Sequence, residues 1–156
     1  NYRTAYLPGI VKAWADGDRS AFVSGTRHAF WLSAVGMTLV VLPFLVLTPE
    51  ICRFFLGSSL PTHTDMFVRM VVFQFYFEAL STPFDTAILA AGRIARYEIA
   101  LTLLVGSSFF IAWIFLAAGL PPWTATGAVA FVSSLAFLYR FLCLRFVRMP
   151  DGTRAW

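Results

Sequence analysis

The residues of this chain best suited to chemistry are two acidic side chains inside a long apolar segment. Residues 70–91 read MVVFQFYFEALSTPFDTAILAA and contain Glu78 and Asp85. The two acids are two helical turns apart, so we expect them on one face, with Gln74 one turn before Glu78 on the same face. A carboxylate at bilayer depth is costly and usually faces a protein interior or a water-filled path. We therefore expect Gln74, Glu78 and Asp85 to line a transport pathway or to couple transport to an ion.

The insertion energetics of this segment indicate a helix that needs neighbours. An acid at the centre of a membrane helix costs about 2.5–3.5 kcal/mol, whereas each Leu, Ile, Val or Phe returns about 0.3–0.6 kcal/mol. Nine such apolar residues offset about 3–5 kcal/mol, against about 5–7 kcal/mol for two central acids. The segment should be stable only beside other helices, beside a hydrated cavity or with one acid protonated. The alternative role for the acids is an ion pair, with a basic residue on a missing helix or, for Asp85, with Arg93 or Arg96.

Composition places the whole chain in a membrane. Of its 156 residues, 59% are hydrophobic and 13% are charged, whereas a soluble domain has about a quarter of its residues charged. The apolar residues gather into runs long enough for a helix to cross about 30 Å of hydrocarbon. The predicted fold is therefore an all-α integral membrane protein with about four transmembrane helices. The predicted spans are residues 29–47, 70–91, 99–118 and 123–139.

The basic residues predict the orientation of these spans. Ten of the twelve lie before the first span, between the second and third, or after the fourth, where Arg140 closes the fourth span and a basic tail, residues 145–156, follows. The positive-inside rule then places both ends of the chain and a predicted loop at residues 92–98 in the cytoplasm, with a predicted loop at residues 48–65 and a tight turn at 119–122 outside. The net charge of +4 follows from this topology and from contact with anionic lipid headgroups. No basic stripe interleaved with aromatic residues is present, which argues against a nucleic-acid partner.

Residues 1–28 precede the first span and form a predicted cytoplasmic segment. The chain opens NYRTAYLP, without Met or an apolar signal region, so we expect it to be the middle of a longer protein. Asp18 is placed as the N-cap of a following helix. That helix is either an amphipathic lead-in lying at the membrane surface or a simple extension of the first span. Pro43 and Pro83 fall inside predicted spans, where we expect bends.

Cysteine and histidine give no indication of a cofactor. Cys52 and Cys143 are predicted at opposite ends of the bundle, so they cannot pair within one chain. His28 and His63 are also on opposite sides, which argues against a haem held by two histidines. No ligand spacing suggests a metal site, and no nucleophile–base pair indicates a hydrolase. We expect no cofactor and no enzymatic activity.

One stretch of the chain resembles a known transporter family. Residues 83–99, PFDTAILAAGRIARYEI, resemble the P…A-x-G-[KR]-I…Y-x-I pattern of bacterial polysaccharide and O-antigen flippases, which belong to the multidrug/oligosaccharidyl-lipid/polysaccharide (MOP) exporter superfamily. The GLPP turn at 119–122 and the basic tail continue the likeness. Upstream, YLPGIVK at 6–12 and WADGD at 14–18 are similar to the cytoplasmic segment that these proteins carry before a long apolar helix.

This resemblance implies a fold, an activity and partners. It implies part of the second lobe of a transporter with about 12–14 helices in two pseudo-symmetric lobes, of which the N-terminal lobe is missing here. The implied activity is translocation of undecaprenyl-linked oligosaccharide across the bacterial inner membrane for surface polysaccharide or lipopolysaccharide assembly. Family members use basic residues in the central cavity, and we expect no Lys or Arg deep in these four spans. The alternatives are a multidrug or cation antiporter of the same superfamily and a structural tetraspan subunit.

Overall fold

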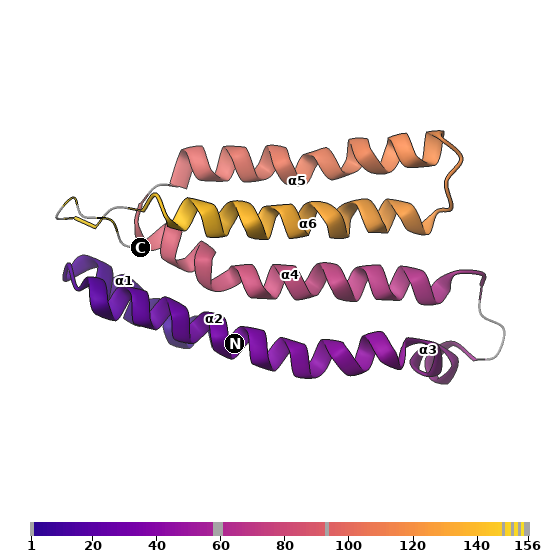
Figure 1. Ribbon diagram of the computed structural model, residues 1–156, viewed down its shortest axis with the longest axis horizontal. Coiled ribbons are helices and arrows are strands. Elements are labelled where there is room, and N and C mark those ends of the chain that lie inside the picture. Colours follow the sequence, from indigo (N-terminus) through magenta and orange to yellow (C-terminus); the bar gives the residue numbers. More distant parts are fainter. Residues whose placement is uncertain are drawn as a thin grey trace.

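The computed structural model consists of helices joined by short turns in the part of the chain that it describes, and no strand is present there. The described residues are 2–57, 61–92, 94–147, 149–150, 152 and 154. Figure 1 shows the helices, which are α1 (Tyr2–Ala15), α2 (Arg19–Val46), α3 (Thr48–Leu56), α4 (Thr64–Ala90), α5 (Ile94–Ala117) and α6 (Trp123–Leu144). The prediction of an all-α protein is confirmed.

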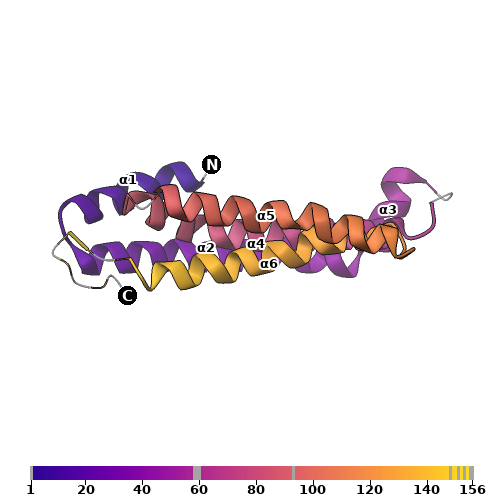
Figure 2. The ribbon, with the colours of Figure 1, turned by 90° about the horizontal axis from the view of Figure 1, so that it is seen from above.

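The four long helices form a row in the order α2, α4, α6, α5 (Figure 1). Helix α4 packs against both α2 and α6, whereas α5 packs against α6. The chain direction makes α4 and α6 parallel and places the α1–α2 turn, the α4–α5 turn and the end of α6 at one end of the bundle. We call this the terminal end. Helix α1 folds back from it along α2 and also contacts α4 (Figure 2).

Three of the helices are long and apolar enough to cross a membrane, namely α2, α5 from Ala95 onward, and α6. This composition indicates a multi-pass membrane protein. Helix α4 has 27 residues, which is also long enough. It is not one of the three because Glu78, Asp85 and several other polar residues interrupt its apolar sequence. A fourth span therefore stays a prediction.

Two predicted loops are mostly helical. Residues 48–65 contain α3, which begins at Thr48 with a proline in its first turn and the acidic Glu50 near its positive end. Residues 92–98 are helical from Ile94 onward. The prediction of loops was wrong at both places because hydropathy detects the part of a helix that fits hydrocarbon, whereas its polar ends continue the same backbone hydrogen bonding outside.

The start of the first long helix follows its sequence signals. The backbone of Asp18 is extended, and its carboxylate accepts hydrogen bonds from the Ala21 N–H at 3.0 Å and from the Ser20 hydroxyl at 2.8 Å. The N-cap prediction is confirmed, and these hydrogen bonds hold the pKa of Asp18 below its usual value. Helix α2 runs without interruption to Val46, so residues 19–28 extend it. Phe22 anchors this region, since it is fully buried with its ring 5.3 Å from that of Trp14 on α1.

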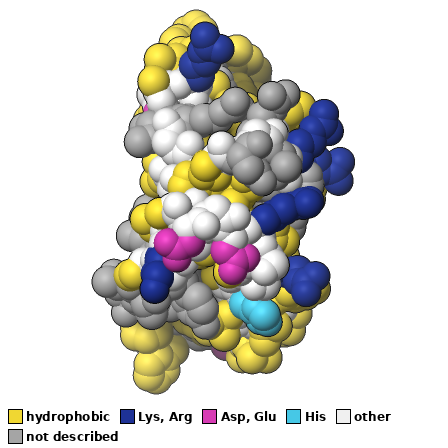
Figure 3. Space-filling view, turned by 90° about the vertical axis from the view of Figure 1, so that its left-hand side faces the viewer, with side chains coloured by type: hydrophobic (Ala, Val, Ile, Leu, Met, Phe, Trp, Pro, Cys, Tyr) yellow, Lys and Arg dark blue, Asp and Glu magenta, His cyan; other side chains and the backbone are white. Residues whose placement is uncertain are grey.

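The terminal end carries many of the basic residues. Figure 3 looks at this end and shows Lys and Arg side chains spread along its rim, with hydrophobic surface between them. Arg93 and Arg148, which the sequence also assigns to this end, lie outside the described residues. The clustering agrees with the expected separation of basic residues from the opposite end.

Candidate functional site

Helix α4 positions the predicted site residues on a bent segment. Pro83 lies inside α4, and Figure 1 shows the helix changing direction toward its α5 end. Proline cannot donate a backbone hydrogen bond and kinks a helix. Before it, the Ser81 and Thr82 hydroxyls donate to the backbone carbonyl of Glu78 at 2.8 and 3.2 Å, a type of contact that also bends helices. The bend separates the part of α4 that holds Glu78 from the part that holds Asp85.

Asp85 takes part in a buried ion pair with Arg140 of α6. The Arg140 Nε donates to Asp85 Oδ1 at 2.8 Å, and the two side chains are 8% and 23% exposed. The Arg140 Nη1 also donates to the Ser81 hydroxyl at 2.9 Å. Hydrogen bonds to a charged group are the stronger kind, and a paired, hydrogen-bonded charge is the form in which charges are buried. These contacts join α4 and α6.

Tyr97 adds the third helix to this cluster. It lies in the first turns of α5, is 5% exposed, and its hydroxyl donates to Asp85 Oδ1. The same hydroxyl oxygen accepts from Arg140 Nε at 3.3 Å. Its ring stacks on Tyr139, with ring centres 5.9 Å apart and planes at 6°. We call Ser81, Asp85, Tyr97 and Arg140 the polar cluster; it links α4, α5 and α6 near the terminal end.

Glu78 lies beside the polar cluster and is held more loosely. Its carboxylate accepts one hydrogen bond among the described residues, from the Ser133 hydroxyl of α6 at 3.3 Å. The Glu78 carboxylate also interacts electrostatically with the Arg140 guanidinium, which is paired with Asp85. The charges of Glu78, Asp85 and Arg140 therefore have to be considered together. Two carboxylates and one guanidinium sum to a charge of −1 when all are ionised. The described part of the chain therefore leaves Glu78 without a charge partner of its own.

Gln74 is not joined to this network. Its side chain is half-buried, and within the described residues it has no hydrogen-bond partner. A nearby polar contact that the sequence did not indicate is between the Tyr76 and Thr38 hydroxyls, 3.0 Å apart, which connects α4 to α2. Gln74 and Glu78 together form a polar strip on the bundle, one turn apart.

The structure corrects the place of Arg140. We expected it to close the fourth span and expected no basic residue deep among the helices, yet α6 continues to Leu144 and Arg140 is 7% exposed within it. The expectation failed because a basic residue was taken as the end of a span. The apolar sequence FLCL after Arg140 was the signal that the helix goes on. Arg96 does not pair with Asp85, while Arg93 lies outside the described residues.

Within the described residues, no group of three or more His, Cys, Asp and Glu side chains comes together, and we assign no metal site there. Comparisons with protein-family models, with curated proteins and with solved structures found no match to this chain.

Proposed function

We propose that this chain is the C-terminal part of a polysaccharide-type MOP flippase that translocates a lipid-linked oligosaccharide across the bacterial inner membrane. The observation that carries the proposal is the charged polar cluster between α4, α5 and α6, among helices apolar enough to span a membrane. Charges in such a setting mark pathways for substrates or ions. The residues of the resemblance, 83–99, include both Asp85 and Tyr97 of the cluster.

The two acids take different parts in this proposal. Asp85 is satisfied by Arg140 and Tyr97, so its part is to hold the bent end of α4 against α5 and α6. Glu78 is half-buried and accepts only one long hydrogen bond among the described residues, from the Ser133 hydroxyl. Its carboxylate is therefore able to accept further hydrogen bonds from the hydroxyls of a sugar. Gln74 can donate and accept one turn away. The proposed pathway residues are therefore Gln74 and Glu78, with Asp85 positioning them.

The proposal includes a missing N-terminal lobe and an orientation. The exposed apolar side chains of α5, such as Phe109 and Trp113, are available to lipid or to further helices of the same protein. The basic terminal end would face the cytoplasm under the positive-inside rule. The substrate would then load from that side, and no bond would be made or broken during transport.

A second candidate is a multidrug or cation antiporter of the same superfamily. The specific observation in its favour is the charge of −1 left on the described cluster, since an uncompensated carboxylate at membrane depth suits a proton or a monovalent cation. In that case Glu78 would bind the coupling ion, while Asp85 and Arg140 would keep their positioning role. A third candidate is a structural membrane subunit, in which the Asp85–Arg140 ion pair serves only to hold the helices together.

The experiment is flipping of a fluorescent undecaprenyl-diphosphate oligosaccharide by the full-length protein containing this chain, reconstituted in liposomes. We expect Glu78→Gln to abolish most translocation, because the amide removes the charge but keeps the shape. Glu50→Gln, at an exposed carboxylate of α3, is the matched control and should leave the rate unchanged. Equal translocation by both variants would remove Glu78 from the pathway. No translocation by the unmodified protein, together with Na⁺ or H⁺ flux that Glu78→Gln abolishes, would establish the antiporter instead.

A further inference from the structure

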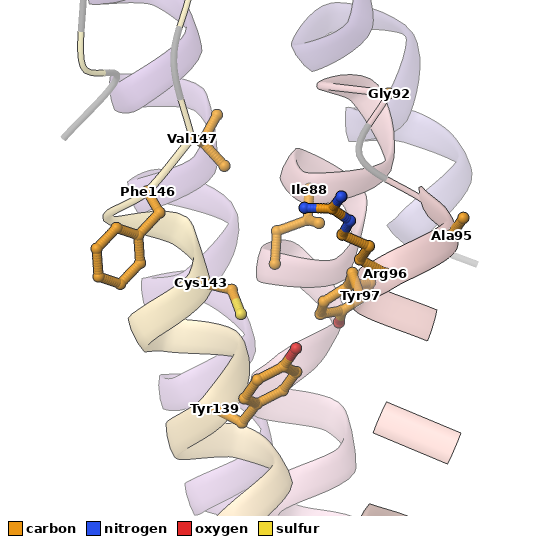
Figure 4. A pocket seen from close by; sticks show the side chains of 9 residues that line it. All are labelled: Ile88, Gly92, Ala95, Arg96, Tyr97, Tyr139, Cys143, Phe146 and Val147. Atoms are coloured by element: carbon orange, nitrogen blue, oxygen red, sulfur yellow. The ribbon is translucent and has the colours of Figure 1, made fainter. Parts of the chain in front are cut away.

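A cavity of about 500 Å³ lies beside the polar cluster at the terminal end, between the start of α5 and the end of α6. Figure 4 shows it from close by: the Arg96 side chain reaches in from α5 toward Ile88 of α4, while the Tyr139 hydroxyl and the Cys143 thiol point in from α6. Its volume is within the range of small-molecule sites, about 300–1,000 Å³. Of the residues that line it, only Tyr97 also belongs to the polar cluster.

The charge of the cavity is suited to an anion. Arg96 is exposed and makes no hydrogen bond or ion pair with any other described residue. None of the residues that line the cavity is acidic. The nearest described carboxylate of the cluster, Asp85, already accepts from Tyr97 and is paired with Arg140. A cation would therefore meet a guanidinium and no free carboxylate, whereas an anion would meet an available positive charge.

The donors in the cavity match a phosphate group. A guanidinium presents N–H groups in a planar fork that pairs with two phosphate oxygens at once. The Tyr139 hydroxyl on the opposite wall is hydrogen-bonded with the Cys143 thiol, and when it accepts from that weak donor its own O–H is free to donate to the phosphate (Figure 4). Tyr97 also lines the cavity, but its proton is engaged with Asp85, so it serves as a wall rather than as a donor.

The remaining lining is apolar, which indicates that the ligand carries more than a phosphate. Ile88, Phe146 and Val147 form this part of the wall. The cavity lies at the first turn of α5, whose apolar span begins at Ala95. A helix of this length covers about 35 Å, so its ends reach the level of the lipid headgroups when it crosses about 30 Å of hydrocarbon. Basic pockets between membrane helices at this level bind lipid headgroups.

We propose that this cavity binds the phosphate headgroup of an anionic glycerophospholipid from the surrounding membrane. The phosphate contacts Arg96 and Tyr139, and the glycerol and the first part of an acyl chain lie against Ile88 and Phe146. The bound lipid is a fixed component of the protein surface at the terminal end, distinct from any transported substrate. The proposal requires only that the helices lie in a membrane and does not depend on flippase activity.

The test is lipid binding by the purified chain in neutral detergent micelles, measured by native mass spectrometry with phosphatidylglycerol and with phosphatidylcholine of the same acyl chains. We expect phosphatidylglycerol to bind more tightly, and Arg96→Ala to weaken it about tenfold through loss of a charge-assisted hydrogen bond. Tyr139→Phe should weaken it roughly threefold. Arg145→Ala is the matched control, since Arg145 lies over the Phe141 ring at the same end of the bundle and outside this cavity.

A second variant fills the cavity without removing charge. Ala95→Trp places a large ring at the exposed Ala95 of its wall and should abolish the phosphatidylglycerol complex while the helical circular dichroism signal is unchanged. Equal losses in Arg96→Ala and Arg145→Ala would overturn the proposal, because binding would then reflect general attraction to basic residues. Equal binding of the two lipids would also overturn it. Displacement of the lipid by inorganic phosphate at comparable concentration would assign the cavity to free phosphate instead.

Discussion

Replacing Arg140 by Met is the most direct test of the polar cluster. The substitution keeps an unbranched apolar stem of similar reach in α6 but leaves the Asp85 carboxylate, 23% exposed, with only the Tyr97 hydroxyl as a described partner. Removing one member of a buried ion pair costs about 3–5 kcal/mol, because the other charge stays buried and uncompensated. This free-energy cost includes the hydrogen bond from Arg140 to Ser81, because the same substitution removes it. We expect the free energy of unfolding to fall by about 3–5 kcal/mol.

The double variant separates the pair from its surroundings. Asp85→Asn removes the second charge and keeps the shape, so Asp85→Asn with Arg140→Met should be less destabilised than the sum of the two single variants. Contacting residues in one network show interaction energies of about 0.5–3 kcal/mol in such cycles. For this buried pair with a 2.8 Å contact we expect a value in the upper half of that range.

The assay is reversible unfolding in mixed micelles with increasing sodium dodecyl sulfate, followed by far-ultraviolet circular dichroism. Arg145→Met serves as the control, because Arg145 contacts an aromatic ring and no described carboxylate, and should change stability by less than about 0.5 kcal/mol. A change below about 1 kcal/mol for Arg140→Met, or strict additivity in the double variant, would refute a buried pair that holds α4 to α6.

Three further outcomes are expected. In the transport assay, Glu78→Asp should keep part of the activity that Glu78→Gln loses, because the charge is retained on a shorter side chain. In the same micelles, Phe22→Ala should lower the free energy of unfolding by about 3–5 kcal/mol as a fully buried ring is removed, whereas Phe109→Ala, 76% exposed, should have little effect. The pKa of Asp18 is lowered by its hydrogen bonds, so its stabilisation of α2 is present above its unfolded pKa, near 3.8, and is lost as pH falls through the lower folded value. Circular dichroism between pH 5 and pH 2.5 should show this loss, and Asp18→Asn, which keeps a capping oxygen, should lack it.

The sequence predicted the features that depend on local composition. Long apolar runs indicate membrane helices because hydrocarbon satisfies no backbone hydrogen bond, and the structure has three helices of that kind. The N-cap at Asp18 was also predictable, since a short acidic side chain before a helix has one favoured role. Helix ends were harder to predict where no capping residue marks them, as α3, the start of α5 and the end of α6 show.

The partner of Asp85 depends on packing between helices that are distant along the chain. Arg140 is 55 residues away, and no periodicity within residues 70–91 contains that information. The sequence identified the acid as costly and offered Arg93, Arg96 or a missing helix as the source of its partner, whereas finding Arg140 required the arrangement of α4 beside α6. The same arrangement left Glu78 without a charge partner among the described residues, which separates the roles of two acids that share a helix face.

The order in which the ribosome makes these residues gives the Asp85–Arg140 pair a consequence for biogenesis. The acid is synthesised 55 residues before its partner, and at about 5–20 residues per second this interval is roughly 3–11 s. During that time the predicted fourth span, α4, is too polar to be stable alone in hydrocarbon by the insertion energies of its two acids. We expect it to stay at the insertion machinery or in the aqueous interface until α6 emerges. Truncation of the nascent chain before Arg140 should therefore leave α4 accessible to water-soluble reagents, and extension past Leu144 should protect it.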